Sequence, residues 1–210
     1  MVPKTKKMQK FRSAKLYLVT STELSNAPTL QILNEALRAG LKLFQLREKT
    51  LIKSEYKELA LLVRSMANKY DALFIVNDHV DVAKEVCADG VHLGQDDMSV
   101  KEARKLLGDE FIIGVSTHNV EEAVKAQNEG ADYINIGPVF ATNTKPFASS
   151  LGIQGIKEIL PHVKIPFTFM GGIKLENVEE LKPFKPAAVA VITELTRSSR
   201  LSVDISTFLS

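Results

Sequence analysis

Eight short apolar runs, each followed by a longer amphipathic stretch, place the strongest constraint on how this chain can fold. The runs are rich in Val, Ile, Leu and Phe throughout, which is typical of strands buried on both faces of a parallel sheet. Because they alternate with helical patterns, the sequence predicts repeated βα units rather than hairpins. The expected strands cover residues 16–20, 43–47, 73–77, 90–93, 111–116, 133–137, 167–170 and 188–192.

The segments between the runs carry apolar residues at helical spacing. Tyr56, Ala60 and Val63 share one face of a predicted helix, and Gly108 is a stop signal after another apolar stripe. Eight strands with intervening helices predict an α/β fold, a closed (β/α)8 TIM barrel. An open, doubly wound sheet is the alternative, but no GxGxxG or Walker loop follows any strand. We therefore expect a single barrel domain over residues 1–210.

The composition agrees with one soluble domain. The chain has 210 residues, is 45% hydrophobic and carries a net charge of only +2, which gives no reason to expect nucleic acid or an anionic membrane as a partner. Cys87 is the single cysteine, which excludes an intrachain disulfide and favours a reducing compartment. No apolar run approaches the ~20 residues that span a bilayer. We expect a cytoplasmic protein that acts on small molecules, with a homodimer left open.

The first fifteen residues are basic and lack the apolar core of a signal peptide. Such charge runs are most often solvated, so the sequence predicts a partly disordered N-terminal arm over residues 1–15. An arm that attracts phosphate or docks a partner is the less common alternative.

Polar residues follow nearly every expected strand. The carboxyl ends of all strands in a barrel meet on one face, where barrel enzymes build their active sites. The sequence therefore predicts one site at that face. Its candidate residues are Gln45, Arg47, Lys49, Asn77, Asp78, Asp97, Ser116, Thr142, Thr144, Lys145, Gly172, Ile192 and Thr193.

Two acids stand at the ends of neighbouring strands. Asp78 and Asp97 are 19 residues apart, which is room for one helix and one strand. Mg2+ prefers oxygen ligands and usually takes one or two carboxylates from a protein, so the pair predicts a magnesium site. Helix capping is the competing interpretation, and for Asp78 capping and metal binding are compatible. Ser99 is the better cap for the next helix, which leaves Asp97 free.

Cations at the same face predict an anionic ligand. Arg47 and Lys49 alternate along an extended segment and so share a side, and two cations in a barrel mouth need anions to offset their desolvation. Bound phosphate is the economical partner, with Glu48 as a structural one. Lys145 lies in a polar loop of the kind that closes over charged substrates, although a mobile solvated loop is equally common.

A second anion site is predicted after the last two strands. Gly171 and Gly172, followed by Ile173, are expected to open a helix whose bare amides approach a phosphate, although a tight turn explains the glycines equally well. Thr193 follows the next strand, in the region where barrels commonly hold phosphate. A pyrophosphate with Mg2+ and a separate monophosphate fit the residues best. The expected chemistry is loss of pyrophosphate from one substrate and its capture by the second.

The motifs resemble those of the thiamine-phosphate synthases, in order, from about residue 16 to residue 195. The matching segments are QLREK at 45–49, NDHVDVA at 77–83, ADGVHLGQDD at 88–97, IGVSTH at 113–118, GADY at 130–133, GPVF at 137–140, TNTK at 142–145 and GGI at 171–173. The resemblance implies a (β/α)8 transferase. Such an enzyme joins 4-amino-5-hydroxymethyl-2-methylpyrimidine diphosphate to hydroxyethylthiazole phosphate through a carbocation-like pyrimidine.

The resemblance also implies a role for each matching residue. Asp78 and Asp97 would bind Mg2+, and Gln45 would face the pyrimidine. Ser116 would lie beside the reacting centre. The pyrophosphate would be held by Arg47, Lys49, Asn77 and Lys145, and the thiazole phosphate by Thr142, Thr144, Gly172, Ile192 and Thr193. Of these, Lys145, Ser116, Arg47 and Lys49 are the expected catalytic residues.

The chain departs from the family pattern in three places. Residues 184–188, FKPAA, replace a glycine-rich stretch before the last strand, and Thr193 replaces the usual serine. The short, serine-rich tail after Leu195 leaves the last helix in doubt. Two rival functions follow from the same fold: a metal-free thiazole tautomerase, in which a histidine typically stands where this chain has Pro138, and a non-catalytic barrel that binds thiamine precursors.

Overall fold

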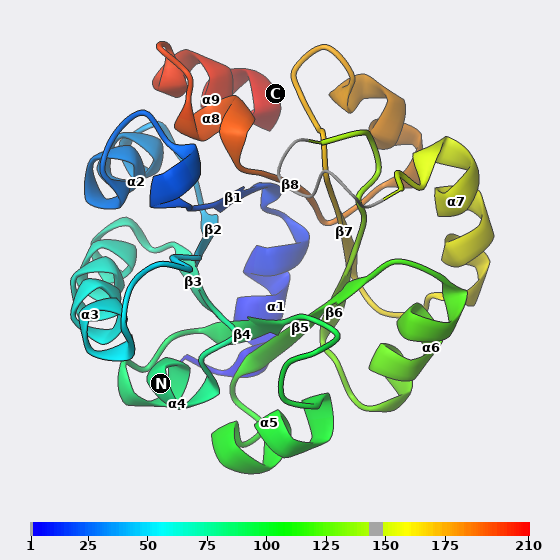
Figure 1. The fold of residues 1–210 in the computed structure, drawn as a ribbon, viewed down its shortest axis with the longest axis horizontal. Helices are drawn as coiled ribbons and strands as arrows, with labels where there is room; N and C mark the ends of the chain where they lie inside the picture. Colours follow the sequence, from blue (N-terminus) through cyan, green and yellow to red (C-terminus); the bar gives the residue numbers. More distant parts are fainter. Residues whose placement is uncertain (1, 143–148) are drawn as a thin grey trace.

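The computed structural model describes residues 2–142 and 149–210, and all eight expected strands are present. They pair in parallel, each with its neighbours in the sequence, and β1 pairs with β8 to close the barrel (Figure 1). The predicted (β/α)8 TIM barrel is confirmed. The strands are β1 (Lys15–Val19), β2 (Leu43–Leu46), β3 (Leu73–Asn77), β4 (Gly90–Leu93), β5 (Ile112–Thr117), β6 (Tyr133–Ile136), β7 (Phe167–Met170) and β8 (Ala188–Val191).

Helices surround the barrel on the outside, as Figure 1 shows. The outer elements are α2 (Thr29–Arg38), α3 (Lys53–Tyr70), α4 (Val80–Glu85), α5 (Val100–Leu107), α6 (Val120–Asn128), α7 (Gly152–Ile159), α8 (Thr193–Thr196) and α9 (Leu201–Leu209), with 3-10 turns η1 (Thr22–Leu24), η2 (Leu160–His162) and η3 (Val178–Phe184). As predicted, Gly108 ends α5, and its φ of +77° suits glycine.

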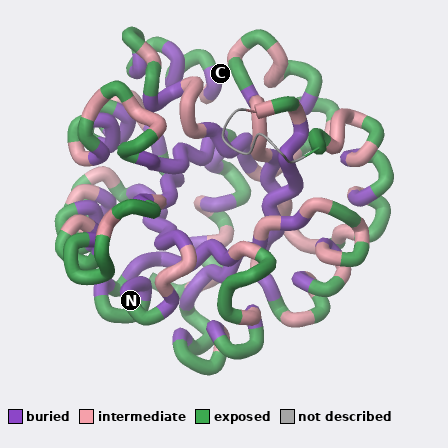
Figure 2. The backbone as a smooth tube through the Cα atoms, viewed as in Figure 1, coloured by how far each residue is buried: buried purple, intermediate pink, exposed green. Residues whose placement is uncertain are grey.

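Two layers of apolar side chains make up the core. The larger layer lies between the strands and the outer helices and includes the predicted stripe of Tyr56, Ala60 and Val63. The smaller one fills the barrel interior around Tyr17 and Tyr133. The strands are therefore buried on both faces, as their continuous apolar runs predict (Figure 2).

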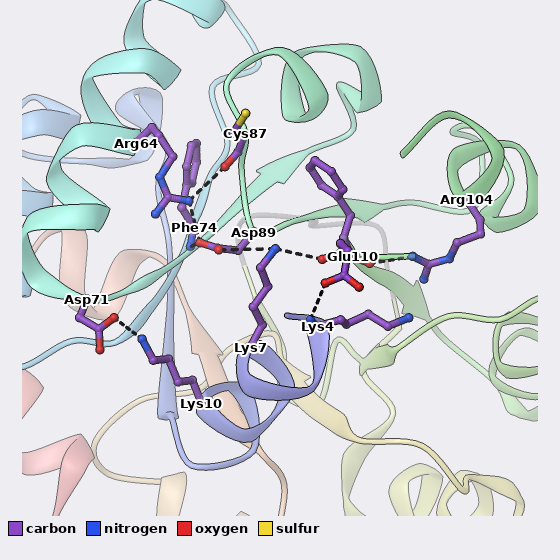
Figure 3. Close-up of polar contacts among 11 residues, drawn as sticks. Lys4, Lys7, Lys10, Arg64, Asp71, Phe74, Cys87, Asp89, Arg104 and Glu110 are labelled. Carbon is purple, nitrogen blue, oxygen red and sulfur yellow. Dashed lines mark hydrogen bonds and ion pairs between the residues drawn. The ribbon is translucent and has the colours of Figure 1, made fainter. Parts of the chain in front are cut away.

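The prediction of a solvated N-terminal arm is wrong. Lys4–Arg12 form helix α1, which lies in the middle of the ring of strands in Figure 1. Phe11 is fully buried in the barrel interior, and the Lys7 ammonium donates 2.9 Å to the carbonyl of Glu110. These contacts lie at the amino-terminal ends of the strands, so α1 closes the bottom of the barrel (Figure 3).

Two further expectations need correction near the end of the chain. No helix begins at Ile173, because the chain turns after Gly172 and the next helical element is η3, which starts at Val178. The doubtful last helix, in contrast, is present: α9 buries Leu201, Ile205 and Phe208, so the serine-rich tail supplies an apolar face as well.

Among the residues that the structure describes, no helix combines the length and the apolar character needed to cross a membrane.

Candidate functional site

The predicted residues meet in one pocket of about 560 Å³ at the carboxyl ends of the strands. Among the described residues, every predicted site residue contributes to its wall: Gln45, Arg47, Lys49, Asn77, Asp78, Asp97, Ser116, Thr142, Gly172, Ile192 and Thr193. Thr144 and Lys145 lie outside the described residues. The alternation of strand and helix therefore brings residues from seven separate segments together, as expected for this face of a barrel.

The two acids lie on one wall of the pocket, after β3 and β4. Desolvation and the neighbouring Asp78 carboxyl raise the pKa of Asp97 above its ordinary value, so the pair concentrates negative charge. Asp97 also accepts 2.7 Å from the amide of Gly94. No described group brings three or more acidic, His or Cys side chains together. Two hard oxygen donors with mutual repulsion suit Mg2+, which completes its shell with water and substrate oxygens.

Capping explains neither acid. Helix α4 has His79 at its N-cap position, with no side-chain cap, while Asp78 pairs with the Lys49 ammonium. Asp78 itself has a φ of +59°, a left-handed backbone that turns the chain after β3. As predicted, Ser99 caps α5, and its hydroxyl accepts 3.3 Å from the amide of Glu102. Asp97 is consequently free of any capping duty there.

Arg47 and Lys49 both face the pocket, and Glu48 points elsewhere. The Glu48 carboxylate is buried and accepts 3.0 Å from the Thr20 hydroxyl and 2.8 Å from the Thr22 amide. The expected structural role of Glu48 is therefore to brace the loop after β1 rather than to neutralise Arg47. Anchoring Glu48 there holds its two cationic neighbours toward the pocket.

The wall opposite the acids is made of backbone and small side chains. Gly171 and Gly172 have φ values of +99° and +62°, and a Cβ on Gly172 would lie 2.4 Å from the carbonyl oxygen of Ala141. The glycines are thus required by a close approach of two loops. Ile192 and Thr193 lie beside them on the pocket wall. The wall thus offers half-buried glycine backbone and the Thr193 side chain to a ligand in the pocket.

Some residues on the pocket wall do not follow from the positions of polar residues at strand ends. His92 is mid-strand on β4, and Asn135, Met170 and Arg197 also line the pocket. His92 is buried and hydrogen-bonded to Tyr133, and it also reaches the site residue Ser116. Strand alternation is the signal that could have found it, since His92 and Gly90 face the side opposite to Val91.

Comparison with known proteins agrees with this geometry. A family model described as thiamine monophosphate synthase matches residues 16–195. The chain belongs to the thiamine monophosphate synthase family. The match runs from the second residue of β1 through β8 and includes every predicted site residue.

Individual relatives of this family cover almost the whole chain. A thiamine-phosphate synthase of Shouchella clausii is 45% identical over 190 residues, 90% of each chain. One from Caldicellulosiruptor saccharolyticus is 41% identical over 204 residues, 96% of this chain and 92% of the relative. A solved structure, a thiamine phosphate pyrophosphorylase from Pyrococcus furiosus, superposes with a TM-score of 0.86 at 35% identity and covers 94% of this chain and 95% of its own.

Barrels outside the family share the fold alone. A 3-hexulose-6-phosphate synthase structure covers 93% of this chain with a TM-score of 0.68, at only 14% identity. Membership of the thiamine monophosphate synthase family therefore depends on the motifs and their order, not on the barrel.

Proposed function

We propose that this chain is a Mg2+-dependent thiamine-phosphate synthase. It joins 4-amino-5-hydroxymethyl-2-methylpyrimidine diphosphate to hydroxyethylthiazole phosphate and releases pyrophosphate. The observation that carries the proposal is one pocket lined by a carboxylate pair, two cations and a wall that includes Gly171, Gly172 and Thr193. The naming of the curated relatives supports the same reaction.

The leaving group has the most demanding charge, and the pocket offers it several cationic and polar groups. Asp78 and Asp97 would hold Mg2+, which neutralises developing charge on a departing phosphate when it is bound. Arg47, Lys49 and Asn77 then surround the pyrophosphate, together with Lys145 on the loop after Thr142. Fixed groups of this kind stabilise charge without reorganising during the reaction.

Capture of the carbocation-like pyrimidine needs a second substrate already in place, because water would otherwise react with it. Gln45 faces the pyrimidine and Ser116 the reacting centre. Thr142, Gly172, Ile192 and Thr193 line the side where the thiazole phosphate would lie, with Thr144 nearby in sequence. No covalent nucleophile is needed in this scheme.

The rival functions lack specific support. Pro138 stands at the position where a tautomerase typically has a histidine, and the acidic and cationic groups that a tautomerase lacks are present. A non-catalytic binding barrel would bind the precursors yet release no pyrophosphate, whereas the relatives of this chain are named as synthases.

The direct test is incubation of the purified chain with both phosphorylated precursors, with and without Mg2+, following pyrophosphate release. We expect release only when both precursors and Mg2+ are present, and thiamine phosphate as the product. Binding of the precursors without any release would support the non-catalytic barrel instead.

Asp97→Ala and Lys145→Ala should each reduce turnover by more than ~10²-fold, because each removes charge stabilisation of the leaving group. Asp96→Ala is the matched control, since Asp96 is an exposed acid next to Asp97 that does not line the pocket. Near-normal turnover in both of the first two variants would contradict the assigned pyrophosphate site.

A further inference from the structure

A continuous chain of hydrogen bonds crosses the interior of the barrel beneath the pocket. The Gln45 amide nitrogen donates 2.8 Å to the Tyr17 hydroxyl, which lies 3.0 Å from the Tyr133 hydroxyl. That hydroxyl lies 2.8 Å from Nδ1 of His92, and Nε2 of His92 lies 2.9 Å from the Ser116 hydroxyl. Five strands thus contribute one residue each, and the chain joins Gln45 at one end to Ser116 at the other.

The buried groups fix the direction in which the protons point. The Gln45 amide N–H can only donate, so the Tyr17 oxygen accepts from it and the Tyr17 proton is left to point at Tyr133. Buried hydroxyls are nearly always paired, and Tyr133 is the one acceptor that the described residues offer to Tyr17. Tyr133 then donates to Nδ1 of His92.

The same direction continues to the pocket. A His92 that accepts at Nδ1 carries its proton on Nε2 in the neutral ring, and it donates that proton to the Ser116 oxygen. The Ser116 hydroxyl keeps its own hydrogen for a group bound in the pocket. Burial also raises the pKa of both phenols, Tyr17 and Tyr133, so both retain the protons that the chain requires.

The neighbouring strand is shaped to let the chain pass. Gly114 on β5 pairs with His92 on one side and with Tyr133 on the other. A Cβ on Gly114 would lie 2.0 Å from Cζ of the Tyr133 ring. The missing side chain therefore opens the path along which the Tyr133 hydroxyl reaches His92, a path that a close-packed interior would otherwise fill.

Helix α1 supplies the floor under the two tyrosines. The Phe11 ring lies 4.4 Å from the Tyr133 ring and 6.4 Å from the Tyr17 ring, measured between centroids. Tyr17, Tyr133 and Phe11 are all at most 1% exposed. Since neither phenol can tilt away without displacing Phe11, the rings hold their hydroxyls at fixed positions below the pocket.

From these contacts we infer that Tyr17, Tyr133 and His92 are positioning residues, which orient Gln45 and the Ser116 hydroxyl as one coupled unit. For the roles of Gln45 and Ser116 this inference rests on the proposed function. The tyrosines touch neither substrate; they act through the residues at the two ends of the chain.

Tyr133→Phe and Tyr17→Phe test the inference with almost no change in volume. Each removes one hydroxyl from the chain, so we expect kcat to fall about 10- to 100-fold, as small misplacements of reacting groups do, with KM for the two precursors nearly unchanged. The double variant Tyr17→Phe/Tyr133→Phe should lose no more than the larger single loss, because both substitutions break the same unit.

A stability control separates positioning from folding. Val63→Ala truncates a buried residue on α3, outside the barrel interior, and should lower the midpoint of thermal unfolding while kcat stays within about twofold of the wild type. Wild-type kcat in both Tyr→Phe variants would overturn the inference and leave the proposed synthase intact. Losses that multiply in the double variant would overturn the coupling.

A spectroscopic measurement tests the chain without any turnover. Nitrogen NMR of the histidine rings should show His92 protonated at Nε2 in the wild-type protein, and a shift toward the Nδ1 form in Tyr133→Phe, which lacks the donor to Nδ1. The Nδ1 form in the wild type would overturn the inferred direction. Absence of pyrophosphate release from the wild type would count against the proposed synthase activity. The NMR spectrum would still show whether the hydrogen bonds run in the inferred direction.

Discussion

At the scale of single residues, Asp78 and Asp97 show how a site can be held ready for a cation. Two carboxyl groups lie close enough for one to raise the pKa of the other, and the Lys49 ammonium and the Gly94 amide offset this effect in part. At neutral pH this arrangement favours the binding of a divalent cation by the two carboxylates. The raised pKa of Asp97 therefore indicates repulsion between the two carboxylates, which a bound Mg2+ would reduce.

Removal of one charge should relieve the same repulsion. Asp97→Asn keeps an oxygen that can accept from the Gly94 amide, so without metal its midpoint of thermal unfolding should be at least as high as that of the wild type. Added Mg2+ should raise the midpoint of the wild type and leave the variant unchanged, because a ligand stabilises only the state that binds it. Thermal melts with and without Mg2+ measure both effects. An equal Mg2+ shift in the two proteins would place the metal elsewhere.

The pH dependence of the metal-free proteins gives a second check. A carboxyl group with a raised pKa in the folded state ionises at a cost, so its unfavourable contribution is absent below the ordinary pKa of Asp and complete above the raised one. Any excess stability of Asp97→Asn should therefore be largest near neutral pH and vanish in acid. Melts from pH 3 to pH 7 would show it, and an excess that grows toward acid would contradict this account.

Most residues of the site follow from the sequence because their position relative to a strand end is enough to place them. Arg47, Asp78 and Thr193 each follow directly after a predicted strand or its apolar run. His92 does not, since its environment depends on Tyr133, Ser116 and Gly114 from two other strands. A single sequence shows that His92 is mid-strand, but not which side chains cross the barrel to meet it.

At the scale of elements, α1 is the part of the fold that the sequence pattern hides. Its residues read as a charge run, since Phe11 and Met8 are nearly the only apolar side chains in it. Lys7 is 2% exposed because its stem is buried, while its ammonium reaches the Glu110 carbonyl and lies over the Phe111 ring. A charged group at the end of a long side chain is therefore a poor indicator that the residue is exposed to solvent.

Truncation of the Phe11 side chain of α1 should lower the stability of the protein strongly. Phe11→Ala empties a fully enclosed site below the tyrosines, and loss of a buried Phe side chain typically costs about 3–5 kcal/mol. Gln9→Ala on the exposed side of the same helix should change the free energy of unfolding by less than about 0.5 kcal/mol. Chemical denaturation measures both variants. A small effect of Phe11→Ala would mean that α1 leaves the barrel easily.

At the scale of the whole molecule, the two ends of the barrel have different duties. The carboxyl ends of the strands hold the pocket, and the amino-terminal ends hold ion pairs that join the strand starts to the helices, of which Figure 3 shows Arg64 with Asp89. Asp132 accepts 2.9 Å from the Ile113 amide and 2.6 Å from Arg104. Asp89 repeats the pattern with Phe74 and Arg64. Barrels commonly divide activity and stability in this way.

Arg104→Met should test that division. The substitution leaves the Asp132 carboxylate and the Phe111 carbonyl without one of their donors, so we expect a loss of about 1–3 kcal/mol in the free energy of unfolding. Turnover and KM should stay at wild-type values well below the unfolding midpoint. Arg38→Met, at an exposed helix end, controls for the loss of a cation. A fall in turnover with unchanged stability would contradict the division.

The position of helix α1 also has a consequence for the order in which parts of the chain can fold. Helix α1 is the first described element to leave the ribosome, yet its partners include Glu110 and Tyr133, and β1 directly after it pairs with β8. Until residue 188 is available, the Phe11 side chain has no closed barrel to enter. Complete docking of α1 should therefore follow the closure of the ring by β8, although the residues of α1 are made before those of β8.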